Sequence, residues 1–265
     1  MIETINEMIA ARGGLVNAQA HLYDKGTRDG VPMDTLYDQM TRRVEAMAAQ
    51  GITTIGSVVE MNGKGADSLL AASRKLQETF SGQMNIQLIG VPSEGIVRPE
   101  AYVELRRRAA EVDVIGGDPS VDASGRVRHI TNILDLGIRE KKPVAMHLSD
   151  STFQTEDLQV LAREVIDRNL QGRIVTSGVG LLDYLSMKDL LRQMNAQVVS
   201  QQAEITQNLK SGLSLSLGTN GRRDFDYRVS ARMVLANCRK TDNLDIGAAV
   251  DILTVNGRRA VGLLQ

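Results

Sequence analysis

Eight short apolar segments rich in β-branched residues recur along the chain, and each is followed by a longer amphipathic stretch. Apolar residues spaced three and four apart, as in Leu36-Met40-Val44-Met47, are typical of helices that bury one face. This alternation predicts repeated βα units with a parallel sheet. The expected strands are Gly14–Ala18, Thr53–Val59, Asn85–Val91, Val112–Gly116, Val144–His147, Arg173–Thr176, Gln197–Ser200 and Leu213–Leu217.

Eight βα units close into a (β/α)₈ TIM barrel, an α/β fold whose reactive groups lie at the carboxyl ends of the strands. The chain has 265 residues, which suits one barrel of ordinary size. No proline- or glycine-rich linker and no short-period repeat divides it, so we expect residues 1–265 to form a single domain. The seventh strand is the least distinct, because the glutamine-rich segment 197–204 also suits a short helix.

The charge and the cysteine content narrow the class of partner. The 31 Lys and Arg residues nearly balance the 32 Asp and Glu residues, so no strong field attracts nucleic acid or an acidic membrane. We therefore expect a small-molecule ligand or substrate. A single cysteine, Cys238, excludes an intramolecular disulfide, and no apolar run approaches the ~18 residues of a membrane span.

The N-terminal segment Met1–Ile9 is amphipathic and acidic and has none of the features of a signal peptide, which predicts a cytoplasmic protein. Its apolar face predicts a homo-oligomer, because a second subunit would cover it.

Polar residues that follow the expected strands form the candidate site, because the carboxyl ends of parallel strands meet at one end of a barrel. Two of the three histidines, His21 and His147, lie at such positions. Gln19 stands two residues before His21, where a His-x-His metal pair would need its first imidazole. The remaining candidates are Lys25, Ser93, Glu94, Asp118, Asp150, Asn220 and Asp224.

An ordered series of motifs resembles the cytosine deaminase branch of the amidohydrolase superfamily. The matching segments are Gly14–Leu22, Asn85–Ile96, Val112–Pro119, Arg128–Ile130, Pro143–His147 and Leu215–Asn220. The resemblance extends over most of the chain, from about Gly14 to Asp251, and is strongest between Gly51 and Asp150. It implies an amidohydrolase-like barrel, and it implies that the β-sandwich that flanks the barrel in this family is absent or vestigial here.

The resemblance also implies site roles, one position at a time. The family holds a divalent metal with two histidines on the first strand, one on the fifth and an aspartate on the eighth. His21 and His147 match two of these ligands, whereas Gln19 and Asn220 replace the other two.

Three further positions correspond to functional residues of the family. Asp150 matches its acid/base carboxylate, and Val179 stands in place of its sixth-strand histidine. Ser93 takes the position of a substrate-binding glutamine, while Asp224 aligns with an aspartate beyond the ligand position.

The donor chemistry of this set argues against a tightly bound metal. Two neutral imidazoles and two carboxamides supply no anionic ligand, whereas zinc and iron sites require electron-rich, usually deprotonated donors. We therefore expect no cofactor, with His21 and His147 as remnant ligands.

Three functions stay open. The first is an enzyme that acts on a small polar nitrogenous or carboxylated substrate by metal-independent acid/base chemistry, with His147, Asp150 and His21 as catalytic residues. The second is a catalytically silent relative that binds a ligand or partner. The third is a metal-dependent C–N hydrolase or deaminase with an incomplete ligand set.

Four of the candidate residues also have a purely structural interpretation. His21 and His147 could be core histidines, Asp150 a capping residue and Lys25 a solvated loop residue. His129, near the expected start of a helix, is more typical of a structural hydrogen bond.

Overall fold

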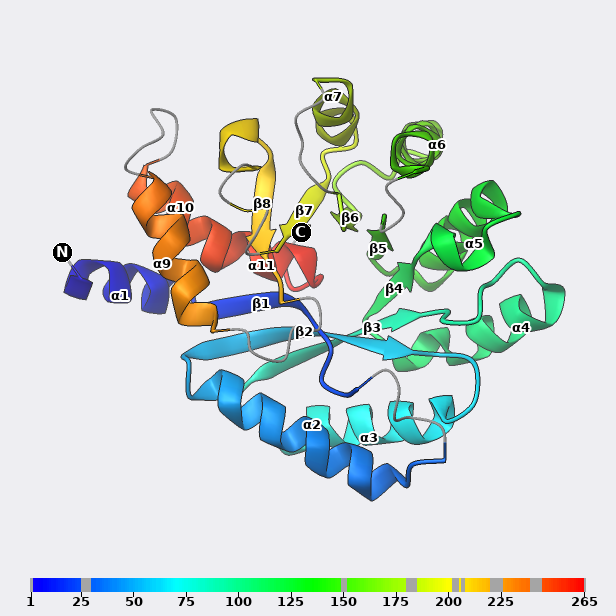
Figure 1. The fold of residues 1–265 in the computed structure, drawn as a ribbon, viewed down its shortest axis with the longest axis horizontal. Coiled ribbons are helices and arrows are strands. Elements are labelled where there is room, and N and C mark those ends of the chain that lie inside the picture. Colours follow the sequence, from blue (N-terminus) through cyan, green and yellow to red (C-terminus); the bar gives the residue numbers. More distant parts are fainter. Residues whose placement is uncertain are drawn as a thin grey trace.

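A computed structural model of the chain contains a parallel eight-stranded sheet that curves into a barrel, with its strands in the order β1 to β8 (Figure 1). It describes residues 2–24, 30–148, 152–179, 185–201, 205, 208–219, 226–238 and 245–264. The strands are β1 Leu15–Ala20, β2 Ile52–Glu60, β3 Asn85–Val91, β4 Val114–Gly117, β5 Val144–His147, β6 Ile174–Ser177, β7 Gln197–Ser200 and β8 Ser214–Leu217. All eight expected strands are confirmed, including the seventh.

Helices connect successive strands and cover the outside of the barrel (Figure 1). They are α1 Ile2–Ala11, α2 Met33–Ala48, α3 Ala66–Thr79, α4 Pro99–Arg108, α5 Arg126–Glu140, α6 Gln154–Asp167, α7 Leu185–Gln193, α9 Tyr227–Cys238, α10 Ile246–Leu253 and α11 Val255–Ala260, with short 3₁₀ turns η1 Ala109–Glu111, η2 Pro119–Asp122 and η3 Leu209–Ser211. No helix in the described part of the chain has the length and apolar character needed to cross a membrane.

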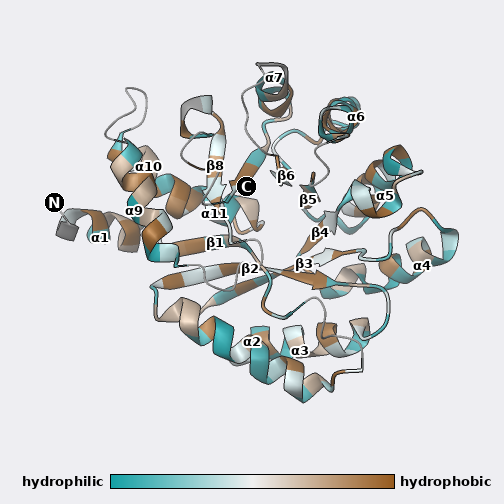
Figure 2. Cartoon of the chain, viewed as in Figure 1, coloured by the Kyte–Doolittle hydropathy of each residue, from teal (hydrophilic) through white to brown (hydrophobic). Residues whose placement is uncertain are grey.

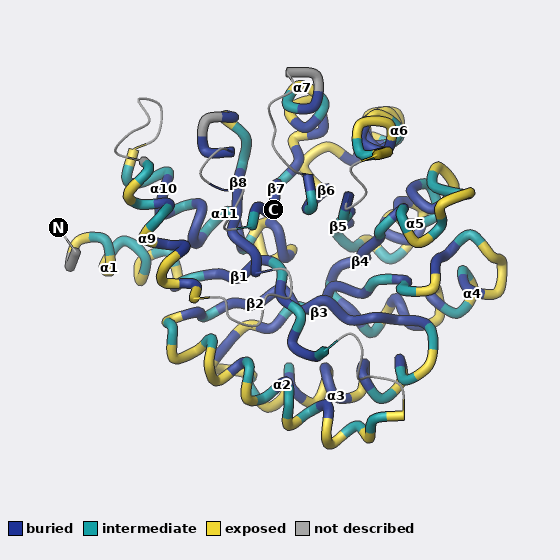
Figure 3. Tube along the Cα trace, viewed as in Figure 1, coloured by how far each residue is buried: buried dark blue, intermediate teal, exposed yellow. Residues whose placement is uncertain are grey.

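The main hydrophobic core lies between the strands and the surrounding helices. Leu36, Met40 and Val44 on α2 are fully buried, as their spacing predicts, and they belong to one continuous apolar cluster with residues of the strands. The apolar colouring of the strands and the exposed outer faces of the helices follow the same division (Figures 2 and 3).

Side-chain and backbone hydrogen bonds join the last strand to the first. The amide of Thr219 donates to the carbonyl of Gln19 over 2.9 Å and to the side-chain oxygen of Asn17 over 3.1 Å. Asn17 is fully buried and in turn donates to the hydroxyl of Thr219. Gly218 permits this approach, because a Cβ there would lie 2.6 Å from Val199 and 3.1 Å from the Cβ of Gln19. These contacts hold β8 against β1.

Helix α11 lies at the end of the barrel where the strands begin. Ala260 and Val261 pack with Ala18, Val175 and Val199 from β1, β6 and β7 in a small apolar cluster that is separate from the main core. The strands leave room for the helix by carrying small residues: a Cβ on Gly56 would lie 2.7 Å from Val261. At this end, the lumen is therefore closed by α11 together with the side chains of the strands.

A buried ion pair links α5 to α6. The guanidinium of Arg126 donates to both carboxylate oxygens of Asp157, with 2.9 Å between Nε and Oδ1. The two side chains are only 10% and 5% exposed. The ring of Phe153 covers the guanidinium, with its centroid 4.9 Å from Cζ. This pair fixes the start of α6, which directly follows the β5 loop.

Candidate functional site

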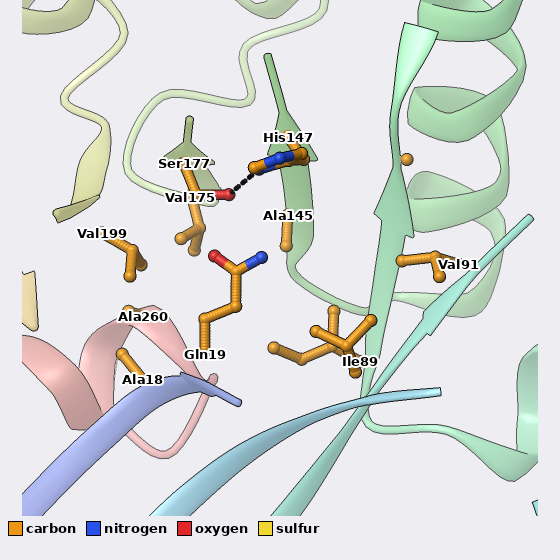
Figure 4. Close-up of a pocket in the computed structure, with 12 residues that line it drawn as sticks. Ala18, Gln19, Ile89, Val91, Ala145, His147, Val175, Ser177, Val199 and Ala260 are labelled. Carbon is orange, nitrogen blue, oxygen red and sulfur yellow. Dashed lines mark hydrogen bonds between the residues drawn. The ribbon is translucent and has the colours of Figure 1, made fainter. Parts of the chain in front are cut away.

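A narrow cavity opens between the side chains at the carboxyl ends of the strands (Figure 4). Its walls are mainly apolar, and among the described residues three polar side chains, those of Gln19, His147 and Ser177, line it. The space open to the centre of a water molecule is about 20 Å³, enough for one or two waters. The apolar lining residues are Ala18, Val58, Ile89, Val91, Ala145, Val175, Val199 and Ala260. We call this cavity the mouth cavity.

His147 is the last residue of β5 and pairs in register with Ser177, the last residue of β6. This register brings the ring Nδ1 of His147 within 2.9 Å of the Ser177 hydroxyl, a hydrogen bond between two strand ends (Figure 4). The imidazole is therefore held in one orientation at the cavity wall. Ser177 directly follows the expected sixth strand, as the other site candidates follow theirs, but only the strand register reveals its pairing with His147.

Gly178 makes room for this imidazole. Its φ of +70° lies in the left-handed region, and a Cβ there would lie 2.7 Å from Cε1 and 2.9 Å from Nδ1 of His147. The Gln154 side chain from α6 donates to the carbonyls of Gly178 and Leu148, 2.6 Å each, and so ties together the loops that follow β5 and β6. The position of His147 is thus fixed from β6 and from α6.

Gln19 enters the same cavity from the opposite side of the barrel. The register of β1 shifts between Asn17 and Ala20, so that the consecutive residues Ala18 and Gln19 both line the mouth cavity. The carboxamide of Gln19 extends towards the side chains of β5 and β6 (Figure 4). The predicted pair Gln19 and His147 is therefore brought together.

His21 lies beyond the end of β1 and is not among the residues that line the mouth cavity. Its carbonyl accepts a hydrogen bond from Arg43, and its ring meets Tyr23 edge-on, with 6.3 Å between the centroids. Val179 is buried in the main core. Lys25, Asp150, Asn220 and Asp224 lie outside the described residues.

Ser93, Glu94 and Asp118 lie on the loops after β3 and β4, where their polar groups shape turns. The Ser93 hydroxyl donates to the carbonyl of Asn62 (3.1 Å), and the Glu94 amide donates to the Asn62 side chain (3.0 Å). Asp118 caps η2 by accepting from the amide and hydroxyl of Ser120 at 2.9 and 2.6 Å. None of the three predicted residues lines the mouth cavity.

His129 and Asp122 connect the loops that follow β3 and β4. His129 is fully buried, and its Nδ1 lies 2.8 Å from the carboxylate of Asp122, which also accepts from the amide of Ile96 at 2.7 Å. Burial raises the pKa of Asp122, but the hydrogen bonds from His129, Ile96 and Val97 outweigh it, so this pKa lies below its ordinary value. The structural interpretation of His129 agrees with this geometry.

This lowered pKa predicts a pH-dependent contribution to stability. The stabilisation by Asp122 is fully present above the ordinary aspartate pKa of ~3.9 and is lost as the pH falls through the lower pKa of the folded protein. Asp122→Asn should therefore lower the free energy of unfolding by about 1–2 kcal/mol at pH 7 and by progressively less below pH ~4. Urea unfolding across this pH range measures the difference, with the exposed Asp38→Asn as the control. A deficit that is constant with pH would contradict the assignment.

The donors around the mouth cavity do not match a divalent-metal site. His147 is the only His, Cys, Asp or Glu that lines the cavity among the described residues, and these residues contain no cluster of three such side chains. The Nδ1 of His147 is engaged with Ser177, and Gln19 offers only a neutral amide. Carboxamide and hydroxyl oxygens without an anionic ligand are weak donors for zinc or iron.

Comparisons with known proteins agree with the barrel. The amidohydrolase family profile matches residues 13–264. An uncharacterized protein of Haemophilus influenzae is 26% identical over 203 residues, which cover 64% of this chain and 72% of that protein.

Solved structures share the fold at lower identity. An N-isopropylammelide isopropylaminohydrolase from Burkholderia multivorans superposes with a TM-score of 0.71 at 20% identity, covering 94% of this chain and 74% of that one. A 5-methylcytosine deaminase from Klebsiella pneumoniae superposes with a TM-score of 0.76 at 17% identity, covering 94% and 75%.

Proposed function

Because the chain belongs to the amidohydrolase family, we propose that it is a hydrolase-like enzyme that acts on a small polar nitrogenous or carboxylated substrate by metal-independent acid/base chemistry. The reaction takes place at the mouth cavity, and His147 transfers the proton. The observation that carries the proposal is the hydrogen bond of 2.9 Å that fixes His147 through Nδ1 to Ser177 beside a mainly apolar cavity.

In this proposal the imidazole of His147 works through Nε2. When Nδ1–H donates to the Ser177 hydroxyl, Nε2 carries the lone pair and can accept a proton from water or substrate and return it to a leaving group. Ser177 is then a positioning residue that sets the tautomer. Asp150, three residues after His147 in the sequence, is proposed as the partner carboxylate, and His21 stays a sequence-based prediction.

The cavity walls support a reaction at one small polar group. Apolar side chains exclude water and lower the local dielectric, which strengthens each remaining polar interaction. With room for only one or two water-sized groups, the cavity admits a single carbonyl or amino group, while the rest of the substrate lies above it. The Gln19 carboxamide, which can donate and accept, would orient that group. Lys25, Asn220 and Asp224 are proposed to contact the remainder.

The choice of bond follows from the family and from the names of two structural relatives. Both an isopropylaminohydrolase and a deaminase share this barrel. The substrate search therefore begins with C–N bonds of small nitrogenous molecules. No step is assigned to a metal, because the described cavity residues lack the anionic donors that a family-type site would need.

The test combines metal analysis with a substrate screen. Protein dialysed against zinc, iron or manganese should hold no stoichiometric metal, and turnover of the substrate identified should persist in chelator and be lost in His147→Gln. His129→Gln is the control for loss of a histidine outside the mouth cavity. Stoichiometric metal that is lost in His147→Gln would overturn the proposal in favour of metal-dependent hydrolysis. A ligand bound without turnover would replace it by a binding role.

A further inference from the structure

A second and larger concavity lies at the opposite end of the barrel. It is formed by the segments that precede β4, β5, β6 and β7 together with the residues around the end of α11, and its volume is about 790 Å³. This volume falls within the range of small-molecule sites. We call it the basal groove. Because it is at the amino ends of the strands, it is distinct from the mouth cavity, and among the described residues only Val175 lines both.

Four basic side chains line the basal groove: Lys141, Lys142, Arg173 and Arg259. They come from three separate parts of the chain, the α5–β5 connection, the α6–β6 connection and α11. Asp113 is the only carboxylate among the described lining residues. It is already engaged, because it accepts from the amide of Leu88 at 2.8 Å and from the side chain of Gln77 at 2.9 Å.

The basic side chains of the groove differ in how many of their hydrogen-bond donors are already bonded within the protein. Lys142 is fixed in place, since its ammonium group donates to the carbonyls of Ala109 and Val112. Arg173 and Arg259 each make one long contact of 3.4 Å to a neutral oxygen, from Lys142 and Asn256 respectively. Among the described residues, neither arginine lies within ion-pair distance of a carboxylate. Most of their guanidinium donors are therefore available.

Neutral hydrogen-bonding groups complete the lining. Gln171 and Asn195 lie on the rim beside Arg173. Four cations against the one carboxylate of Asp113, which also attracts Lys142, leave the described lining with a net positive charge, and a concave surface focuses the resulting potential. The planar fork of an arginine suits two oxygens of a phosphate or carboxylate, and two forks with a nearby lysine suit a ligand with more than one negative charge.

We propose that the basal groove binds a small, multiply charged anion of phosphate chemistry, held mainly by Arg173 and Arg259. Lys142 contributes charge from a fixed position, and the exposed Lys141 contributes a second ammonium. The proposal does not depend on the reaction at the mouth cavity. Ala260, the last residue of α11, lines the mouth cavity, and Arg259 beside it in the sequence lines the basal groove.

The test is calorimetric titration of the full chain with inorganic pyrophosphate at low ionic strength. One pyrophosphate should bind per chain, and Arg173→Gln/Arg259→Gln should weaken binding at least about tenfold. The matched control is Arg106→Gln/Arg107→Gln, which removes the same charge from two exposed arginines in the last turn of α4. Thermal unfolding of both variants confirms that they fold.

Three outcomes would overturn the proposal. The first is that the unmodified protein does not bind pyrophosphate. The second is an equal loss of affinity in the two double variants, which would show that binding depends only on overall charge. The third comes from co-sedimentation with phosphatidylglycerol vesicles. Vesicle binding that Arg173→Gln/Arg259→Gln abolishes, without pyrophosphate binding, would assign the groove to a lipid headgroup instead of a free anion.

Discussion

Replacing Asp157 by Asn is expected to lower the free energy of unfolding by about 3–5 kcal/mol. The substitution keeps the size of the side chain but removes the carboxylate to which the guanidinium of Arg126, only 10% exposed, donates. A buried charge that loses such a contact cannot replace it with water without opening the α5–α6 contact. Urea unfolding followed by circular dichroism measures the loss.

The matched control is Asp34→Asn, which breaks the ion pair to Lys75 on the surface. There the side chains are 81% and 45% exposed, and the expected loss is below about 1 kcal/mol. A second variant, Arg126→Met/Asp157→Leu, removes both charges and should recover much of the stability lost in Asp157→Asn. Equal losses for Asp157→Asn and Asp34→Asn would show that the buried pair is no stronger than a surface pair.

Gly178→Ala is expected to displace His147 and to lower the free energy of unfolding by about 2–4 kcal/mol. The loss combines the cost of a left-handed backbone at a residue with a Cβ and the overlap with the imidazole, 2.7 Å from Cε1. If His147 transfers the proton as proposed, a displacement of this order should also reduce turnover about 100-fold. Urea unfolding measures the loss of stability, and the imidazole ¹⁵N shifts of His147 measure the displacement of its ring.

Gly82→Ala separates the two contributions. Gly82 also has a positive φ, +86°, but a Cβ there would meet nothing within 4 Å. Its substitution should cost only about 1 kcal/mol and leave the ¹⁵N shifts of His147 unchanged. If Gly178→Ala had the same small cost and also left those shifts unchanged, His147 would not depend on the space that the glycine provides.

The barrel could be predicted from the sequence because strands buried on both faces are read directly as apolar runs. The meeting of Gln19 and His147 followed from the same logic, since each lies near the carboxyl end of its strand. Ser177 also follows its expected strand, but its hydrogen bond to His147 could not be predicted in this way. Its role depends on the register between β5 and β6, which is a tertiary property.

The loops after β3 and β4 show a second limit of the sequence pattern. Ser93, Glu94 and Asp118 follow strands as site residues do, but they form turns with Asn62 and Ser120. Serine, aspartate and asparagine stabilise turns and bind ligands with the same atoms. Position in the sequence does not distinguish the two uses.

Helix α11 determines when this protein can finish folding. Gly257 packs directly against Val16, and Val261 fills the space beside Gly56, so the lumen requires contacts between residues more than 200 positions apart. Such non-local contacts slow folding because a long loop must close before they form. On the ribosome, the strands would have to wait with an unfilled interior until the last of these residues emerged. We therefore expect a collapsed intermediate that is open to proteases and chaperones until α11 inserts.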